Sequence, residues 1–149
     1  MLNLSLIVPF YNEEIYLEKS VHRLLENNIY EKIILIDNNS TDNSNYIAHQ
    51  LAKQNKNIRV HKTGIERGKG SALTYSKQFI ETSHVVIHDA DLEYFPDDII
   101  KMFKLCEENP NSLILGSRFI GNEERKNVYF RTSLANRVMS LFLSLINFY

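Results

Sequence analysis

The sequence predicts an α/β fold in which a mainly parallel sheet is flanked by helices. Short apolar runs rich in Ile, Leu and Val alternate with longer amphipathic stretches, giving a repeated β-α order. Several runs are apolar throughout instead of alternating with polar residues, as in strands that helices cover on both faces. The five expected strands are residues 4–8, 33–37, 58–61, 85–88 and 113–116.

The stretches between these strands carry apolar residues at helical spacing. Three expected helical faces are Leu17-Val21-Leu24-Leu25, Ala72-Ser76-Phe79-Ile80 and Ile99-Phe103-Cys106. Pro96 begins the last of these helices, because proline is favoured in a first turn and Asp97 and Asp98 follow at the positive end of the helix dipole. No repeat, low-complexity tract or linker interrupts the pattern, so we expect residues 1–149 to form a single domain.

The composition is that of an ordinary folded domain. Hydrophobic residues make up 44% and charged residues 23% of the 149, which excludes a disordered or collagen-like chain. With 17 basic and 18 acidic side chains and a pI near 6.5, the chain lacks the charge of a nucleic-acid binder. The single cysteine forms no internal disulfide, and Asn3, Ser5 and Pro9 interrupt the start where a secretory signal is apolar. We therefore expect a cytoplasmic protein.

The end of the chain predicts an apolar helix over residues 138–149, in which the polar residues are Ser140, Ser144 and Asn147. This stretch is shorter than the roughly 20 apolar residues that span a bilayer. A basic collar of Arg125, Lys126, Arg131 and Arg137 precedes it, as in helices that lie on the cytoplasmic face of a membrane. The alternative is a core helix whose partners follow in sequence, and in both cases we expect the chain to be truncated.

Polar side chains follow the expected strands, where an open parallel sheet binds its ligands. Asp89, Asp91 and Glu93 leave the fourth strand at alternate positions, so we expect their carboxylates to crowd on one side. Such oxygen ligands suit Mg²⁺ or Mn²⁺, which use one or two carboxylates together with substrate phosphates. The alternative is a solvated acidic loop. His88 is expected to pack at the strand end instead of adding a fourth ligand.

A glycine-rich segment follows the third strand, with the sequence Gly64-Ile65-Glu66-Arg67-Gly68-Lys69-Gly70. It is not a P-loop, because three residues instead of four separate its first glycine from Gly-Lys, and a glycine replaces the required Ser or Thr. We interpret it as a flexible basic loop that approaches an anionic ligand, or alternatively as a plain surface turn.

Five motifs in order resemble those of the family 2 glycosyltransferases of GT-A (Rossmann-like) fold. The likeness is greatest to the branch of dolichyl-phosphate mannose synthase and the bacterial polyprenyl-phosphate glycosyltransferases, and Asn136-Arg137 also matches that branch. The motifs are Pro9-x-Tyr11-Asn12-Glu13, Asp37-Asn38-Asn39-Ser40-x-Asp42, Arg67-Gly68-Lys69-Gly70, Asp89-Ala90-Asp91-Leu92-Glu93 and Gly116-Ser117-Arg118-Phe119.

The resemblance implies a role for each matching position. Pro9, Tyr11 and Glu13 match the nucleoside-binding motif, and Asp37 matches the aspartate that contacts the base or ribose. Asn38 replaces a second aspartate, a change that affects nucleotide preference. The remaining roles concern the diphosphate and the metal. Asp89 and Asp91 match the ligands of the metal and the diphosphate, and Glu93 matches a third metal ligand. Lys69 belongs to the loop over the donor, and Arg118 and Arg131 match basic residues that hold phosphate groups.

The implied activity is metal-dependent, inverting transfer of a sugar from a UDP- or GDP-sugar to a polyprenyl or dolichyl phosphate. The acceptor phosphate is itself the nucleophile, which suits a chain without an obvious base beside the metal motif. The family's acceptor-side segment lies beyond Tyr149, so one alternative is a donor-binding fragment or a subunit completed by a second chain. The other alternative is a metal-dependent phosphohydrolase that uses Asp89 and Asp91.

Overall fold

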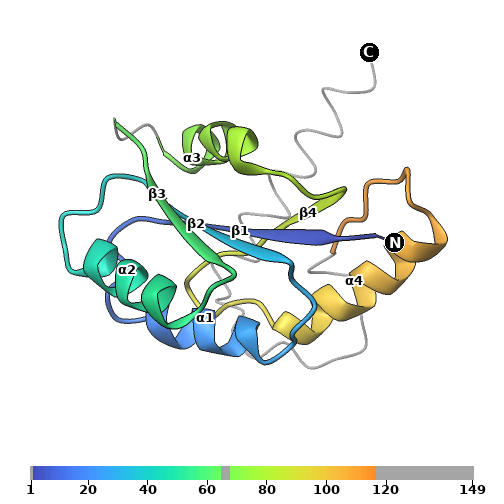
Figure 1. Cartoon of the computed structure of the whole chain (residues 1–149), viewed down its shortest axis with the longest axis horizontal. Coiled ribbons are helices and arrows are strands. Elements are labelled where there is room, and N and C mark those ends of the chain that lie inside the picture. The colour runs from blue at the N-terminus through green and yellow to red at the C-terminus, as the bar shows by residue number, and fades with distance from the viewer. Residues whose placement is uncertain (1, 65–67, 117–149) are drawn as a thin grey trace, which may run out of the picture. The chain divides into compact units, whose positions relative to one another are not determined.

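Four parallel strands form the centre of the part that the computed structural model describes, residues 2–64 and 68–116 (Figure 1). The elements occur in the order β1 (Leu4–Phe10), α1 (Leu17–Leu25), β2 (Lys32–Asp37), α2 (Ser44–Gln54), β3 (Ile58–Lys62), α3 (Lys69–Ser76), the 3₁₀ helix η1 (Lys77–Phe79), β4 (His84–Ile87) and α4 (Pro96–Glu108). The strands lie in the order β3-β2-β1-β4 and all neighbours are parallel. The predicted α/β architecture is confirmed.

The two faces of the sheet are covered by different helices. Helices α1, α2 and α4 lie on one face and α3 lies on the other (Figure 1). On the first face, Leu6, Val8 and Leu35 belong to a buried cluster that includes residues of all three helices. On the second face, Ile7, Ile34 and Ile36 pack against residues of α3 and η1. Because both faces of β1 and β2 are buried, these strands are mainly apolar on both faces instead of alternating with polar residues, as the sequence indicated.

The strand order places a switch point between β1 and β4. From β1 the chain moves outward through β2 to β3, and it then crosses back to add β4 on the other side of β1. The segments after β1 and β4 therefore lie next to each other at the carboxyl ends of these strands. Open parallel sheets bind ligands at such a switch point.

Strand β1 is longer than predicted, because it continues through Pro9 to Phe10 beside β2. Pro9 has no N–H to donate, yet no ladder bond is lost. Phe10 accepts from Asn38 on the β2 side, so Pro9 faces the β4 side, where the ladder already ends at Ile7.

Two predictions about secondary structure are wrong. Residues 113–116 form no strand, and the side chains of Leu113 and Leu115 are 83% and 78% exposed. A strand needs a hydrogen-bonded neighbour, and among the described strands β4 pairs with β1 alone. Helix α3 also stops at Ser76, so that Phe79 lies in η1 and Ile80 is extended, although both still pack against the core.

The described residues belong to one structural unit that ends at Gly116, and a single domain over residues 1–149 stays a prediction. No helix within the described ranges has both the length and the hydrophobicity needed to cross a bilayer. The apolar helix predicted for residues 138–149 lies outside the described residues, as does its basic collar.

Candidate functional site

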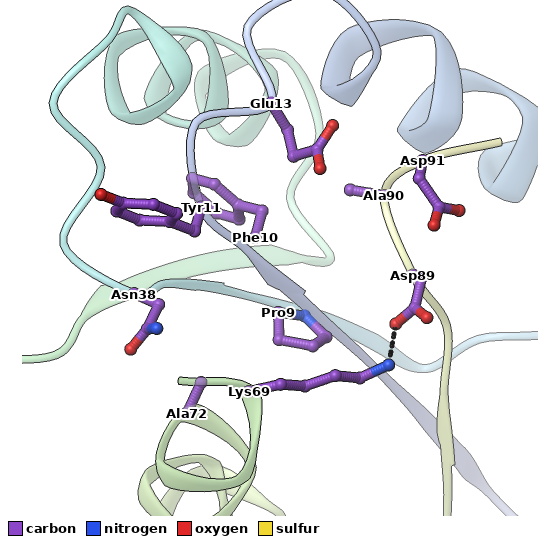
Figure 2. Close-up of a pocket in the computed structure, with 10 residues that line it drawn as sticks. All are labelled: Pro9, Phe10, Tyr11, Glu13, Asn38, Lys69, Ala72, Asp89, Ala90 and Asp91. Atoms are coloured by element: carbon purple, nitrogen blue, oxygen red, sulfur yellow. Dashed lines mark hydrogen bonds and ion pairs between the residues drawn. The ribbon is translucent and has the colours of Figure 1, made fainter. Parts of the chain in front are cut away.

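A pocket of about 240 Å³ opens at the carboxyl ends of β1 and β4, at the switch point (Figure 2). Seven of its lining residues are ones that the sequence indicated: Pro9, Tyr11, Glu13, Asn38, Lys69, Asp89 and Asp91. The other three are Phe10, Ala72 and Ala90, which the sequence analysis did not select. The sequence held a signal for two of them, because Ala90 separates the two aspartates and Phe10 lies between Pro9 and Tyr11 of the first motif. The pocket therefore unites segments from four parts of the sequence.

The side of the pocket near β1 and β2 carries an aromatic ring and an amide. Tyr11 follows β1 and is 39% exposed, whereas Asn38 follows β2 and is 5% exposed. Thr63 Oγ1 donates to Asn38 Oδ1 at 3.3 Å, which holds the amide in place. Figure 2 shows Tyr11 and Asn38 on the side of the pocket away from the aspartates. A flat ring with a nearby amide can stack on and hydrogen-bond a planar heterocycle.

Three carboxylates lie on the other side of the pocket. Asp89 and Asp91 follow β4, and Glu13 approaches them from the loop after β1 (Figure 2). Burial, and then repulsion from Asp91, Asp42 and Asp89, raise the pKa of Glu13 above its usual value. Besides its burial, the Glu13 carboxylate thus lies within the electrostatic reach of these three aspartates. A cation is thus favoured at this place.

The Lys69 ammonium group supplies one such positive charge, from the start of α3 on the opposite side of the pocket. It is the first residue of α3, after Gly68, whose positive φ of 79° suits glycine. Lys69 Nζ reaches across the pocket to Asp89 Oδ1 at 2.5 Å (Figure 2). Half of the Lys69 side chain is exposed, so a ligand can displace it at modest cost.

The expected crowding of Asp89, Asp91 and Glu93 is not found. Strand β4 ends at Ile87, and Leu92 has a positive φ of 65°, so the alternation of an extended strand does not continue to Glu93. The Glu93 side chain is exposed and does not line the pocket, although its N–H donates to Asp91 Oδ1 at 3.0 Å. Within the described ranges, no three His, Cys, Asp or Glu side chains are placed to hold a metal together. Two carboxylates with room for phosphate oxygens fit the way Mg²⁺ binds.

Asp37 lies behind the pocket and does not line it. Its side chain is fully buried at the end of β2. Asp37 Oδ1 accepts from the Ser40 N–H and Oδ2 accepts from Asn45 Nδ2, each at 2.7 Å. Lys62 Nζ lies 3.9 Å from Oδ2. In this structure the carboxylate therefore organises the loop after β2, and its contact with base or ribose stays a prediction.

His88 packs at the end of β4, as expected. It is 5% exposed, and its ring meets Tyr94 edge-on with the centroids 5.9 Å apart. Neither ring nitrogen has a hydrogen-bond partner among the described residues. Burial lowers the pKa of His88, so the ring is neutral at physiological pH. The remaining predicted site residues, Arg118 and Arg131, lie outside the described residues.

Comparison with protein families gives a match to "Glycosyl transferase family 2" over residues 5–147. A Methanococcus voltae protein named UDP-N-acetylglucosamine–dolichyl-phosphate N-acetylglucosaminyltransferase is 32% identical, over 96% of this chain and 61% of that protein. The dolichol-phosphate mannosyltransferase of Saccharomyces cerevisiae is 30% identical, over 77% of this chain and 44% of its own length. The chain thus spans less than two thirds of the length of these curated relatives.

Solved structures give the same result for the fold. The mannosyltransferase PcManGT from Pyrobaculum calidifontis, in complex with GDP-Man and Mn²⁺, superposes with a TM-score of 0.64. It is 24% identical, and the match covers 70% of this chain and 32% of that one. Glucosyl-3-phosphoglycerate synthase from Mycobacterium tuberculosis, with Mn²⁺, UDP and phosphoglyceric acid, gives a TM-score of 0.59 at 22% identity, over 69% of this chain and 38% of that one. The chain belongs to glycosyl transferase family 2, and its described part has the GT-A fold.

Proposed function

We propose that this domain binds a UDP- or GDP-sugar with a divalent cation and transfers the sugar to a polyprenyl or dolichyl phosphate. The observation that carries the proposal is the two-sided pocket at the β1–β4 switch point. One side offers a ring and an amide, and the other offers carboxylates and a lysine. Family membership favours this interpretation over a metal-dependent phosphohydrolase.

The two sides match the two ends of a nucleoside diphosphate. The base and ribose lie along Tyr11, Pro9 and Asn38, where apolar surface and an amide are available. The diphosphate lies toward Asp89 and Asp91, which would hold a divalent cation whose charge offsets the repulsion between phosphate and carboxylate. The UDP and dolichyl phosphate in the name of the Methanococcus voltae relative support the proposed donor and acceptor.

Asp89 and Asp91 are the proposed ligands of Mg²⁺ or Mn²⁺, with Glu93 as a third ligand after a side-chain rotation. The raised pKa of Glu13 and the ion pair of Lys69 with Asp89 support a cation at this place. Mn²⁺ in the complexes of two proteins with this fold is in agreement. Held by these residues, such an ion would supply positive charge to offset the charge that develops on the leaving diphosphate.

The protein's own groups position the reactants in this proposal. A phosphate monoester with a second pKa near 6 is mostly dianionic at neutral pH, so the acceptor needs no strong base to attack the sugar carbon. Lys69 moves from Asp89 to a donor phosphate. Arg118 and Arg131, which lie outside the described residues, hold phosphate groups of the reactants in this proposal. Attack from the face opposite the leaving nucleotide inverts the configuration at that carbon.

We place this reaction at the cytoplasmic face of a membrane, where the lipid phosphate is accessible. Arg125, Lys126, Arg131 and Arg137 attract anionic headgroups, at about 1 kcal/mol for each residue near the surface. The apolar stretch over residues 138–149 adds apolar surface that can insert at the membrane–water interface.

The test is transfer of radiolabelled sugar from UDP- and GDP-sugars to polyprenyl phosphate in detergent or vesicles, with Mg²⁺ or Mn²⁺. The proposal expects a labelled lipid product that is absent with Asp91→Ala and in EDTA. Donor binding without any transfer would contradict the catalytic part and favour a donor-binding fragment, or a subunit completed by a second chain. Absence of donor binding would contradict the whole proposal.

A further inference from the structure

The loops after β1 and β2 are joined by hydrogen bonds between side chains and backbone. The Asn12 N–H donates to Ser40 Oγ at 3.0 Å, and the Thr41 N–H donates to Asn12 Oδ1 at 2.8 Å. Glu14 both donates and accepts a hydrogen bond: its N–H donates to Asp42 Oδ2 at 3.1 Å, and its Oε2 accepts from the Asn43 N–H at 3.0 Å. We call this group of contacts the loop clasp.

Hydrogen bonds of Ser44, the first residue of α2, also belong to the loop clasp. Its Oγ accepts the Glu13 N–H at 2.7 Å and donates its own hydrogen to Asp42 Oδ1 at 2.5 Å. The Ser44 side chain is fully buried and lies outside the pocket. Because Asp42 takes the hydroxyl hydrogen, a lone pair of Ser44 remains directed at Glu13.

The residues held in this way are pocket residues. Glu13 lines the pocket with its side chain, and Tyr11 directly precedes Asn12, whose backbone has a positive φ of 54°. Asn39, in the opposite loop, also has a positive φ of 69°. Asparagine adopts this left-handed conformation more readily than most residues with a Cβ, and neighbouring hydrogen bonds help to hold it. The loop clasp supplies such contacts on both sides.

The charge on Asp42 keeps the loop clasp in one arrangement. Burial acts to raise the pKa of Asp42, but hydrogen bonds from Ser44 and Glu14 outweigh it and lower the pKa below the usual value. Asp42 is therefore ionised at neutral pH and only accepts hydrogen bonds, which fixes the direction of the chain from Glu13 through Ser44 to Asp42.

We propose that Ser44, supported by Asp42, is a positioning residue that sets the place of Glu13 and Tyr11 for donor binding. The inference rests on the proposed function for its ligand, but the geometry it invokes does not depend on that function. Ser44 touches no substrate in this proposal. It acts through the backbone of Glu13.

The test compares Ser44→Ala with Ser5→Ala. Ser5 is also fully buried and accepts a hydrogen bond from Thr82, but it lies near the other end of β1, away from the pocket. We expect Ser44→Ala to bind UDP or GDP with Mg²⁺ about tenfold more weakly, because small displacements of positioning groups have large effects. Ser5→Ala should bind as the unchanged chain does. Asp42→Ala should resemble Ser44→Ala, and Asp42→Asn, which keeps one acceptor for Ser44, should fall between.

Amide hydrogen exchange gives a readout that needs no nucleotide. The Glu13 amide should exchange faster in Ser44→Ala, whereas the amides of β1 keep their protection. Unchanged Glu13 exchange, or equal nucleotide affinity in Ser44→Ala and Ser5→Ala, would overturn the inference. If Ser44→Ala does not fold, the two Asp42 variants decide by the same readouts. If the unchanged chain binds no nucleotide, the proposed function fails, and Glu13 exchange still decides whether Ser44 holds this loop.

Discussion

On the β1–β2 side of the pocket, Tyr11 and Asn38 belong to loops that the loop clasp joins, whereas on the β4–α3 side Asp89 is bonded to the half-exposed Lys69 across the opening. The first arrangement depends on hydrogen bonds from backbone N–H groups and the Ser44 hydroxyl to side-chain oxygens, including the carboxylates of Glu14 and Asp42, so it needs no ligand to form. The second is an ion pair that another cation can replace. The comparison suggests a preformed nucleoside side and an exchangeable phosphate side. Three variants test these two descriptions.

The largest effect is expected for Asp37→Ala, which removes the buried acceptor behind the preformed side. The Ser40 N–H and the Asn45 amide lose their partner, and a buried unpaired group costs about 1–3 kcal/mol. Urea unfolding followed by circular dichroism measures the loss. Asp98→Ala, at an exposed ion pair with Lys101 on α4, is the control and should change the free energy of unfolding by less than about 0.5 kcal/mol. Equal stability in both variants would show that Asp37 does not organise its loop.

A smaller effect is expected for Lys69→Met on the exchangeable side. Without Lys69, Asp89 is open to a metal ion, so Mn²⁺ alone should bind about two- to fivefold more tightly, the range of a partly exposed ion pair. In the presence of metal, the same variant should bind UDP or GDP more weakly, since a phosphate partner is lost. Lys62→Met removes an equal charge beside Asp37, outside the pocket, and should leave Mn²⁺ affinity nearly unchanged. Equal tightening in both variants would indicate a general charge effect.

The smallest effect is expected for Glu13→Gln, where the two sides meet. The pKa of Glu13 in the folded chain lies above its ordinary value of 4.5, so the folded state holds this proton more tightly than the unfolded state does. The ionised carboxylate therefore reduces stability as pH rises through the folded-state pKa. Glu13→Gln should therefore raise the free energy of unfolding at pH 7 by about 0.5 kcal/mol or less, because solvent screens the site. A slightly higher melting temperature measures this gain. The gain should vanish below the ordinary pKa and shrink when Mg²⁺ is added. A gain that grows toward low pH would contradict this account.

Much of the fold was predictable, because hydrophobic pattern and strand ends are local properties. Buried strands β1 and β2 needed only their apolar runs, and the polar residues after β1, β2 and β4 were placed at one edge by the rule for parallel sheets. The strand at residues 113–116 failed for a non-local reason. An apolar run becomes a strand only when it pairs with another strand. Among the described residues, 113–116 pair with none, and no periodicity reveals such pairing.

The site shows the same division. Glu13, Asn38, Lys69 and Asp91 line one pocket, whereas Glu93 is exposed and does not line it. Leu92, directly before Glu93, has a positive φ, and such a local change of backbone direction is not visible in the spacing of the carboxylates. Ser44 was missed, since its partner Glu13 lies 31 positions earlier in the chain. The signal was the pair Asp42-x-Ser44 before a helix, where such side chains often bond nearby backbone.

The central claim is that carboxylates and nucleotide share one cation in this pocket, and titration calorimetry with UDP and GDP tests it most directly. The account predicts binding with Mg²⁺ or Mn²⁺ that is lost in EDTA. It also predicts that Asp91→Ala weakens binding by about 10- to 150-fold, as expected when a charged partner worth about 1.5–3 kcal/mol is removed. Equal affinity with and without metal, or unchanged affinity in Asp91→Ala, would contradict the account.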